Sequence, residues 1–160
     1  GVKVETNIRE SGKGWNQPII DQGTEASVAG LVRQLDTDGT PLYLIEAKFE
    51  PGNYDEVLLS PTIQVTYDNL NKLHDGRKPL FSEYFDGGEQ TGIIKFEHWY
   101  PEDGGRFYLK RVKNMLVRVP ETQKITIPDN FIWVTMHQLK MLLKQDNLIN
   151  PHLRSIISYL

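Results

Sequence analysis

The spacing of apolar residues changes along the chain from a repeat of two to a repeat of 3.6, and this change constrains the fold more than any other feature. Between residues 26 and 119 the apolar runs are short, β-prone and separated by turns. Apolar residues then recur at helical spacing over 135–145 and again over 151–159. Strands followed by helices predict an α+β fold, with a mixed or antiparallel sheet and C-terminal helices.

Turn-forming residues divide the first part of the chain into strands. We predict strands at Ala26–Leu35 and Leu42–Glu50, joined as a hairpin by the turn DTDGTP. A Pro-Gly-Asn turn at 51–53 follows, in which Gly52 or Asn53 is expected to adopt a positive φ. The next strand, Leu58–Tyr67, is interrupted at Pro61, which predicts a bulge or an edge position there.

Further strands and helices complete the predicted fold. A short helix is predicted at Tyr67–His74, a strand at Ile93–Tyr100, and the longest strand at Arg106–Val119. Thr135 and Gln138 have the spacing of a capping box at the start of the first C-terminal helix. Asn150 followed by Pro151 is typical of the start of the second.

Composition limits the classes of protein to which the chain can belong. With 160 residues, 39% apolar and 24% charged, we expect one soluble globular domain over 1–160, with residues 1–14 as a flexible tail. The alternative for Gly1–Ser11 is an edge strand. A net charge of −3 lacks the basic footprint of nucleic-acid binding. The sequence contains no cysteine, which excludes disulfides and thiolate catalysis. Without a signal peptide or a membrane-length apolar run, we predict a cytoplasmic protein that does not contact membranes.

Polar side chains alternate along two neighbouring predicted strands. Glu46, Lys48 and Glu50 share one face of the strand before the Pro-Gly-Asn turn. The strand after the turn presents Thr62 and Gln64 at the same spacing. This pattern predicts the floor of a cleft, although a solvated strand surface produces the same alternation.

The sequence favours neither a metal nor a cofactor. His74, His98, His137 and His152 are scattered without ligand spacing, and there is no paired-carboxylate cluster. The chain also lacks a GxGxxG sequence, a P-loop and the glutamate-rich Nudix box. We therefore predict no metal site and no cofactor.

A cluster of cations and one tryptophan suit a phosphate-bearing ligand. Arg106, Lys110, Arg111 and Lys113 lie within eight residues, and arginine can hold a pyrophosphate in bidentate fashion. The alternative is a solvated basic strand balanced by acidic loops. Trp15, in the loop GKGWNQ, is either a packing residue or a platform on which a nucleobase stacks.

Three separate blocks carry a resemblance to a known family. EAKFEPGN, LSPTIQVTYDN and GGRFYLKRVKN resemble the signature of the NDP-hexose 2,3-dehydratases of deoxysugar biosynthesis, and the similarity runs from about Trp15 to Ser158. The SEQGxRF block of the family corresponds to 101–107 here, and its KRNRN block to 110–114. This chain departs from the blocks at Pro101, Asp103 and Val112, which removes a hydroxyl and two amides that specificity or activity can require.

The resemblance implies a fold similar to the Nudix superfamily, without its metal chemistry, and it implies a reaction. Family members remove the 2-hydroxyl of an NDP-4-keto-6-deoxyhexose, for example dTDP-4-keto-6-deoxyglucose, without a cofactor, and give a 3,4-diketo-2,6-dideoxy sugar. The partner implied is therefore a nucleotide-sugar substrate. The alternative is a non-catalytic sugar-nucleotide-binding domain derived from the same family.

The length of the chain adds an expectation about assembly. Enzymes of this family usually carry two copies of the domain, and this chain carries one, so a homodimer is expected. We expect apolar residues of the C-terminal helices to form the contact: Leu148, Ile149, Ile156 and Leu160.

The reaction assigns roles to residue types. Removal of the C3 hydrogen needs a base, the developing enolate needs a donor, and the departing hydroxyl needs an acid. Lys48 is the candidate donor, and Glu50, His74 and Tyr84 are the candidate acids or bases. Lys48 and Glu50 as a surface ion pair, and Tyr84 as a core aromatic, are the structural alternatives. The candidate substrate-binding residues are Trp15, Asn53, Thr62, Gln64, Glu102, Arg106, Lys110 and Asn114.

Overall fold

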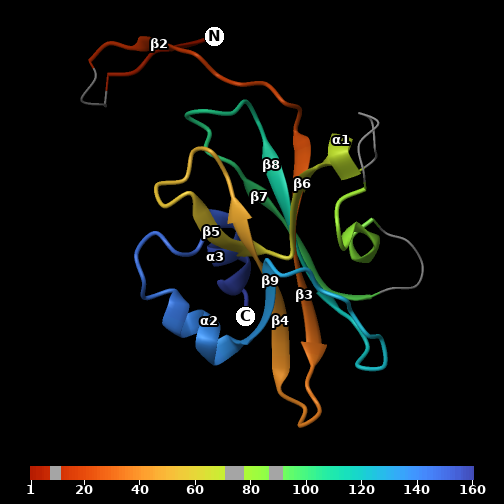
Figure 1. The fold of residues 1–160 in the computed structure, drawn as a ribbon. Helices are drawn as coiled ribbons and strands as arrows, with labels where there is room; N and C mark the ends of the chain where they lie inside the picture. The colour runs from red at the N-terminus through yellow and green to blue at the C-terminus, as the bar shows by residue number, and fades with distance from the viewer. Residues whose placement is uncertain (8–11, 71–77, 87–91) are drawn as a thin grey trace.

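Seven strands form one mixed sheet in the computed structural model, which describes residues 1–7, 12–70, 78–86 and 92–160 (Figure 1). The strands are β3 (Glu25–Leu35), β4 (Pro41–Phe49), β5 (Val57–Pro61), β6 (Ile63–Thr66), β7 (Ile93–Pro101), β8 (Arg111–Arg118) and β9 (Phe131–Thr135). Their order is β5-β4-β3-β8-β7, with β6 paired to β3 and β9 to β4. Only the β3–β8 pair is parallel among the described strands, so the predicted α+β fold with a mixed sheet is confirmed.

The sheet divides where β3 and β4 separate. β8 occupies one side of β3, and on the other side β4 pairs with its second half while β6 pairs with its first half. Beyond the Val32–Leu44 pair, the chain of β5 and β6 enters between the two strands, and Pro61 lies at the end of β5 where the partner changes. The Thr62 hydroxyl accepts a 2.8 Å hydrogen bond from the Val32 N–H and donates to the Leu44 carbonyl. Thr62 thus links β3 and β4 at the point where they separate, which we call the fork. The interruption predicted at Pro61 is confirmed.

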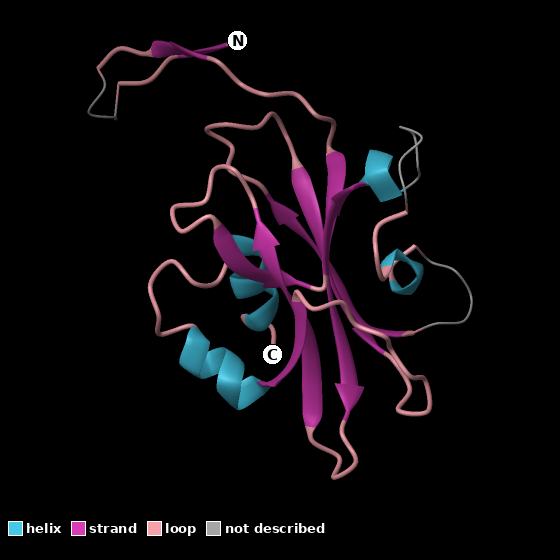
Figure 2. Ribbon diagram, viewed as in Figure 1, coloured by secondary structure: helices cyan, strands magenta, loops and turns pink. Residues whose placement is uncertain are grey.

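Each face of the sheet has its own apolar core. Figure 2 shows helices on both sides of the strands. On one face α2 (Met136–Leu142) and α3 (Pro151–Ile157) bury Leu139, Leu153 and Ile156. The other face is covered by the segment that contains the 3₁₀ turn η1 (Ser82–Tyr84). Gly30 makes this packing possible, because a Cβ at that position would lie 2.3 Å from the Phe85 ring.

The predicted helix starts are confirmed by their caps. Thr135 and Gln138 form both bonds of a capping box at α2, and the Asn150 side chain accepts from the Leu153 N–H at α3. Both helices end a few residues earlier than predicted. The helix predicted at Tyr67–His74 is present as α1 (Tyr67–Leu70), and its remainder lies outside the described residues.

Two local predictions were wrong in detail, and one strand was not predicted. The strand predicted from Arg106 begins at Arg111, because residues 103–109 form a loop in which the Asp103 carbonyl accepts from the N–H groups of Arg106 and Phe107. The positive φ expected at Gly52 or Asn53 occurs instead at Glu56, where φ is 60°. The strand β9 was not predicted, because its five residues lead directly into α2 and offer too short an alternation.

The N-terminal residues form a separate two-stranded ribbon. β1 (Val2–Val4) pairs antiparallel with β2 (Trp15–Gln17), and Figure 1 shows this ribbon extending from one end of the sheet. Among the described helices, none has the length and apolarity that a membrane crossing requires.

Candidate functional site

Polar side chains gather where β4 separates from β3. Lys48, near the end of β4, lies 3.3 Å from the Glu50 carboxylate and donates to the backbone carbonyl of Gln64 at 3.3 Å. The Gln64 amide donates to the same carboxylate at 3.3 Å. The Lys48 and Glu50 side chains are 23% and 36% exposed, so both remain accessible to a ligand. The two predicted polar strands are therefore in contact.

The start of α3 is hydrogen-bonded to the strand that carries Gln64. The Asn150 amide donates to the Gln64 side chain at 2.7 Å and to the Ser60 hydroxyl at 2.9 Å. Its oxygen accepts the capping bond from Leu153 at 2.8 Å. One buried asparagine therefore starts the helix and fixes its first turn beside Lys48 and Glu50.

A second ion pair comes from the loop between β7 and β8. The Lys110 ammonium lies 3.6 Å from the Glu102 carboxylate, and both side chains are largely buried. It also donates to the Gln22 side chain at 3.0 Å and lies 4.3 Å from the centre of the Phe107 ring. Glu102 and Lys110 are thus ordered by several contacts at the end of the sheet.

His152, in the first turn of α3, lies within the electrostatic range of both ion pairs. Burial lowers its pKa from the ordinary 6.5, the charges of Glu102 and Glu50 raise it, and those of Lys110 and Lys48 lower it. Burial is the largest of these effects, so the imidazole is neutral at neutral pH. We call His152, Lys48, Glu50, Glu102 and Lys110 the His152 cluster.

His152 was not selected from the sequence. The sequence signal that was available is its place two residues after the N-cap Asn150, which fixes it in the first turn of a helix. Nothing in the local pattern shows that this turn packs against strands almost 90 residues away.

Two of the predicted binding residues are buried within the fold. Thr62 closes the fork and is 2% exposed. Asn114, on β8 beneath α3, is 1% exposed and donates to the Ser155 hydroxyl at 2.7 Å. The Asn114 side-chain oxygen has no hydrogen-bond partner among the described residues.

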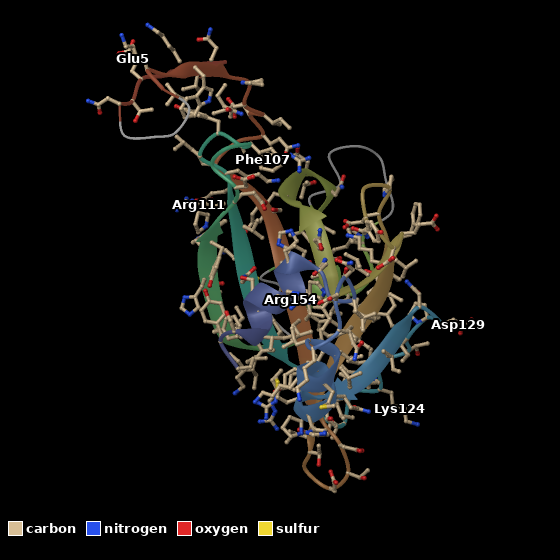
Figure 3. The ribbon with its side chains drawn as sticks, turned by 90° about the vertical axis from the view of Figure 1, so that its left-hand side faces the viewer. Glu5, Phe107, Arg111, Lys124, Asp129 and Arg154 are labelled. Carbon is tan, nitrogen blue, oxygen red and sulfur yellow. The ribbon has the colours of Figure 1, made fainter. Side chains whose placement is uncertain are left out.

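Three other predicted binding residues lie in loops or in the N-terminal ribbon. Asn53 donates to the Glu56 carbonyl and orders the turn after β4. Trp15 lies in β2, where its indole donates to the Gln17 side chain at 2.8 Å. The Arg106 guanidinium lies 5.2 Å from the centre of the Phe107 ring, at the end of the sheet that carries the ribbon. Figure 3 shows Phe107 at this end.

Tyr84 belongs to a different part of the molecule from the His152 cluster. It is 8% exposed, accepts from the Gln123 amide, and lines a cavity of about 370 Å³ on the opposite face together with Lys113 and Glu97. Burial raises its pKa, which disfavours the phenolate. His74, the remaining candidate acid or base, lies outside the described residues.

The basic block at 110–114 divides between the two faces of the sheet. Lys110 joins the His152 cluster, whereas Arg111 and Lys113 each lie 5.0 Å from the Trp99 ring on the other face. Arg111 also pairs with Glu25 at 3.1 Å, and Lys113 with Glu97 at 3.8 Å. The four cations therefore do not form one phosphate site.

The His152 cluster contains the groups that a proton abstraction next to a carbonyl requires. A neutral imidazole can accept a proton, and the Lys48 ammonium can stabilise an oxyanion. The carboxylates of Glu50 and Glu102 favour the imidazolium once it forms. In the part of the chain that the structure describes, no three His, Asp or Glu side chains are grouped so that they could hold a metal ion.

Comparison with known proteins identifies relatives over the whole chain. The family model described as NDP-hexose 2,3-dehydratase matches residues 1–160. A dTDP-4-dehydro-6-deoxy-alpha-D-glucopyranose 2,3-dehydratase of Saccharopolyspora spinosa is 39% identical over 158 residues, which are 99% of this chain and 31% of that protein. The protein of the same name from Amycolatopsis orientalis is 35% identical over 91% of this chain and 30% of its own length. The chain thus spans about a third of the length of these relatives.

Solved structures resemble the chain more distantly. A Caenorhabditis elegans Ap4A hydrolase shares 11% identity at a TM-score of 0.46, over 89% of this chain and 98% of that one. RenU, a Nudix hydrolase from M. smegmatis, shares 14% identity at a TM-score of 0.39, over 99% and 97%. The family assignment rests on the sequence matches rather than on these structures.

Proposed function

The chain belongs to the NDP-hexose 2,3-dehydratase family, and from that premise we propose that it removes water across C2 and C3 of an NDP-4-keto-6-deoxyhexose. The named relatives favour dTDP-4-keto-6-deoxyglucose as the substrate. One observation supports the proposal above all. The sequence blocks that carry the family resemblance supply Lys48, Glu50, Glu102 and Lys110, whose charges all act on one neutral histidine, and Gln64, which donates to Glu50.

The first step is removal of the hydrogen at C3. The 4-keto group acidifies this hydrogen, and His152 accepts it because its lowered pKa leaves the imidazole unprotonated at neutral pH. The electron pair left on C3 is delocalised onto the C4 oxygen. We assign stabilisation of that enolate to the Lys48 ammonium, held by Glu50 and the Gln64 carbonyl.

The second step is loss of the 2-hydroxyl. The enolate expels the group from C2, and the imidazolium formed in the first step donates its proton to it, so one water molecule leaves and His152 is neutral again. The C2–C3 double bond then carries the 3-hydroxyl. This enol tautomerises when the O3 proton is lost and C2 is protonated, which gives the 3-keto group. No external oxidant or reductant is required.

The second candidate function is nucleotide-sugar binding without turnover. The departures of this chain from the family blocks at Pro101, Asp103 and Val112 favour it. Both candidates predict binding of the nucleotide sugar, and only the dehydratase predicts its consumption.

Mass spectrometry of the sugar separates the two candidates. The protein is incubated with dTDP-4-keto-6-deoxyglucose, and the sugar is analysed for the loss of one water. We expect a product lighter by one water, which forms in proportion to protein concentration. Tight binding with unchanged substrate would support the binding domain instead.

A further inference from the structure

One side of α3, and of the turn that follows it, carries a row of polar and aromatic side chains. His152, Ser155 and Tyr159 stand at i, i+3 and i+7, which is the spacing of one helix face. The helical turn continues past the end of α3, because the Tyr159 N–H donates to the Ile156 carbonyl at 3.1 Å. We call His152, Ser155 and Tyr159 the α3 row. Its first member is the histidine of the His152 cluster.

The strand β7 presents a second row of side chains. Phe96, His98 and Tyr100 alternate along β7 and therefore share one of its faces, and we call them the β7 row. Glu102, which belongs to the His152 cluster, follows Tyr100 at the same spacing. Asn114, on β8, lies opposite His98 in the register of the two strands. The β7 row therefore leads along the strand to the His152 cluster.

Hydrogen bonds join the two rows near the middle of α3. The buried Asn114 amide donates to the Ser155 hydroxyl at 2.7 Å. Hydrogen bonding with Tyr159, and then with Ser158 and Ser155, lowers the pKa of Tyr100. The hydroxyl of Tyr100 is therefore held against the last turn of the helix.

Aromatic contacts join the rows at their far end. The centre of the Tyr159 ring lies 5.0 Å from the centres of both the His98 and the Phe96 rings. Tyr159 stacks on His98 with an angle of 25° between the ring planes, and it meets Tyr100 edge-on at 5.7 Å and 87°. One side chain of the α3 row thus contacts all three members of the β7 row.

These contacts are directional, unlike the burial of the apolar side of α3. The hydrophobic effect holds that side on the sheet, but it is non-directional and does not select one rotation of the helix. Hydrogen bonds and ring contacts have preferred geometries. The contacts of Ser155 and Tyr159 therefore fix the rotation of α3 at the end opposite its cap, and this rotation sets the place of His152.

We infer that Tyr100 and Tyr159 are positioning residues for the proposed dehydration: they hold the last turn of α3 against β7 and so keep His152 within range of the charges of Glu102 and Lys110. Neither tyrosine is assigned a contact with the sugar. The inference rests on the proposed function for the role of His152 as the base, but the surroundings of His152 can be measured without turnover.

Nuclear magnetic resonance titration of His152 tests the positioning, with H152Q to assign the resonance. In the unmodified protein we expect His152 to titrate below 6.5, because burial is the largest effect on its pKa. Y159A removes the ring contacts and one hydroxyl, so His152 gains solvent and its pKa should rise toward 6.5. Y100F and Y159F keep the rings and lose one hydroxyl, and each should give a smaller shift in the same direction. T135A is the control, because it weakens the capping box of α2 and leaves both rows intact.

The pH dependence of turnover gives a second readout. The acidic limb of kcat against pH reports protonation of the base, so in Y159A it should move to higher pH together with the pKa of His152. We expect kcat at neutral pH to fall about tenfold while KM changes little, because a displaced base slows the chemical step. A lower kcat with an unmoved limb would mean that Y159A only loses stability, and it would contradict the positioning role.

The two readouts separate this inference from the proposed function. A raised pKa of His152 in Y159A, with T135A unchanged, supports the positioning even if the protein shows no turnover. An unchanged pKa in Y159A, or an equal shift in T135A, would overturn it even if dehydration is normal. Y100F decides the question should Y159A fail to fold, and an unchanged pKa of His152 in Y100F would then overturn the inference.

Discussion

Thr62 and Gln64 lie two residues apart on one predicted polar face, yet they have different roles. Alternation correctly predicts that both side chains point away from the apolar set of their strand. It does not predict that β3 and β4 separate at this point, because strand separation depends on pairing between distant segments. The Thr62 hydroxyl is hydrogen-bonded to the backbone at the fork, while the Gln64 side chain forms hydrogen bonds with Glu50 and Asn150.

Replacing Thr62 tests its role in closing the fork. T62V has a similar shape but leaves the Val32 N–H and the Leu44 carbonyl without their partner. We expect the free energy of unfolding to fall by about 1–3 kcal/mol for each buried group left unpaired. Urea unfolding measures this loss. T62S retains the hydroxyl and should lose much less; equal losses in T62V and T62S would contradict the assigned role.

His152 should make stability depend on pH. Because burial lowers its pKa in the folded state, the unfolded chain binds the proton more readily. The free energy of unfolding contributed by this group is therefore complete above pH 6.5 and decreases as the pH falls through 6.5. Urea unfolding at several pH values should show this decrease, and H152Q should show a smaller one. An identical pH dependence in H152Q and the unmodified protein would exclude the effect.

At the scale of elements, local signals were predictable and long-range pairings were not. Thr135 with Gln138, and Asn150 with Pro151, carry their information within a few residues, so the helix starts agree with the sequence. The loop at 103–109 depends on a β-bridge between Phe107 and Ile20, which are almost 90 residues apart. The alternation of residues does not reveal this contact, so the strand was predicted to run through the loop. The placement of His152 within range of the charges of Glu50 and Glu102 was missed for the same reason.

The cap of α3 should couple stability to activity. N150A removes the capping bond and the bonds to Ser60 and Gln64, and the capping bond alone is worth about 0.5–2 kcal/mol. We expect lower stability and also slower turnover, because the cap positions the helix turn that carries His152. T135A, the equivalent change at α2, should lose similar capping energy and keep its turnover. Thermal unfolding and sugar analysis are carried out on both variants. Equal turnover by N150A and T135A would show that Asn150 does not position His152.

At the scale of the whole molecule, the expected homodimer stays a prediction, but two of the residues chosen for its contact were wrong. Ile149 and Ile156 are 4% and 0% exposed and belong to the core beneath α3. Of the other chosen residues, Leu160 is 41% exposed, and exposed apolar residues also occur on β7, an edge strand of the sheet, where Ile93 and Ile94 are 56% and 49% exposed. An apolar edge strand favours association with another chain.

Light scattering at micromolar concentration tests the dimer. We expect a mass of about twice 18.4 kDa, and we expect I94K to reduce it because a lysine on the edge opposes pairing. A mass of 18.4 kDa for the unmodified protein would show that the chain is a monomer.

The central claim is that the His152 cluster carries the dehydration, and comparison of two histidine variants tests it most directly. H152Q removes the proposed base, whereas H137Q makes the same change on the exposed surface of α2. The rate of water loss from dTDP-4-keto-6-deoxyglucose is measured for both variants and for the unmodified protein. We predict that H152Q is at least a hundredfold slower, as expected for loss of a general base, and that H137Q matches the unmodified protein. Turnover by H152Q at the rate of the unmodified protein would contradict the claim.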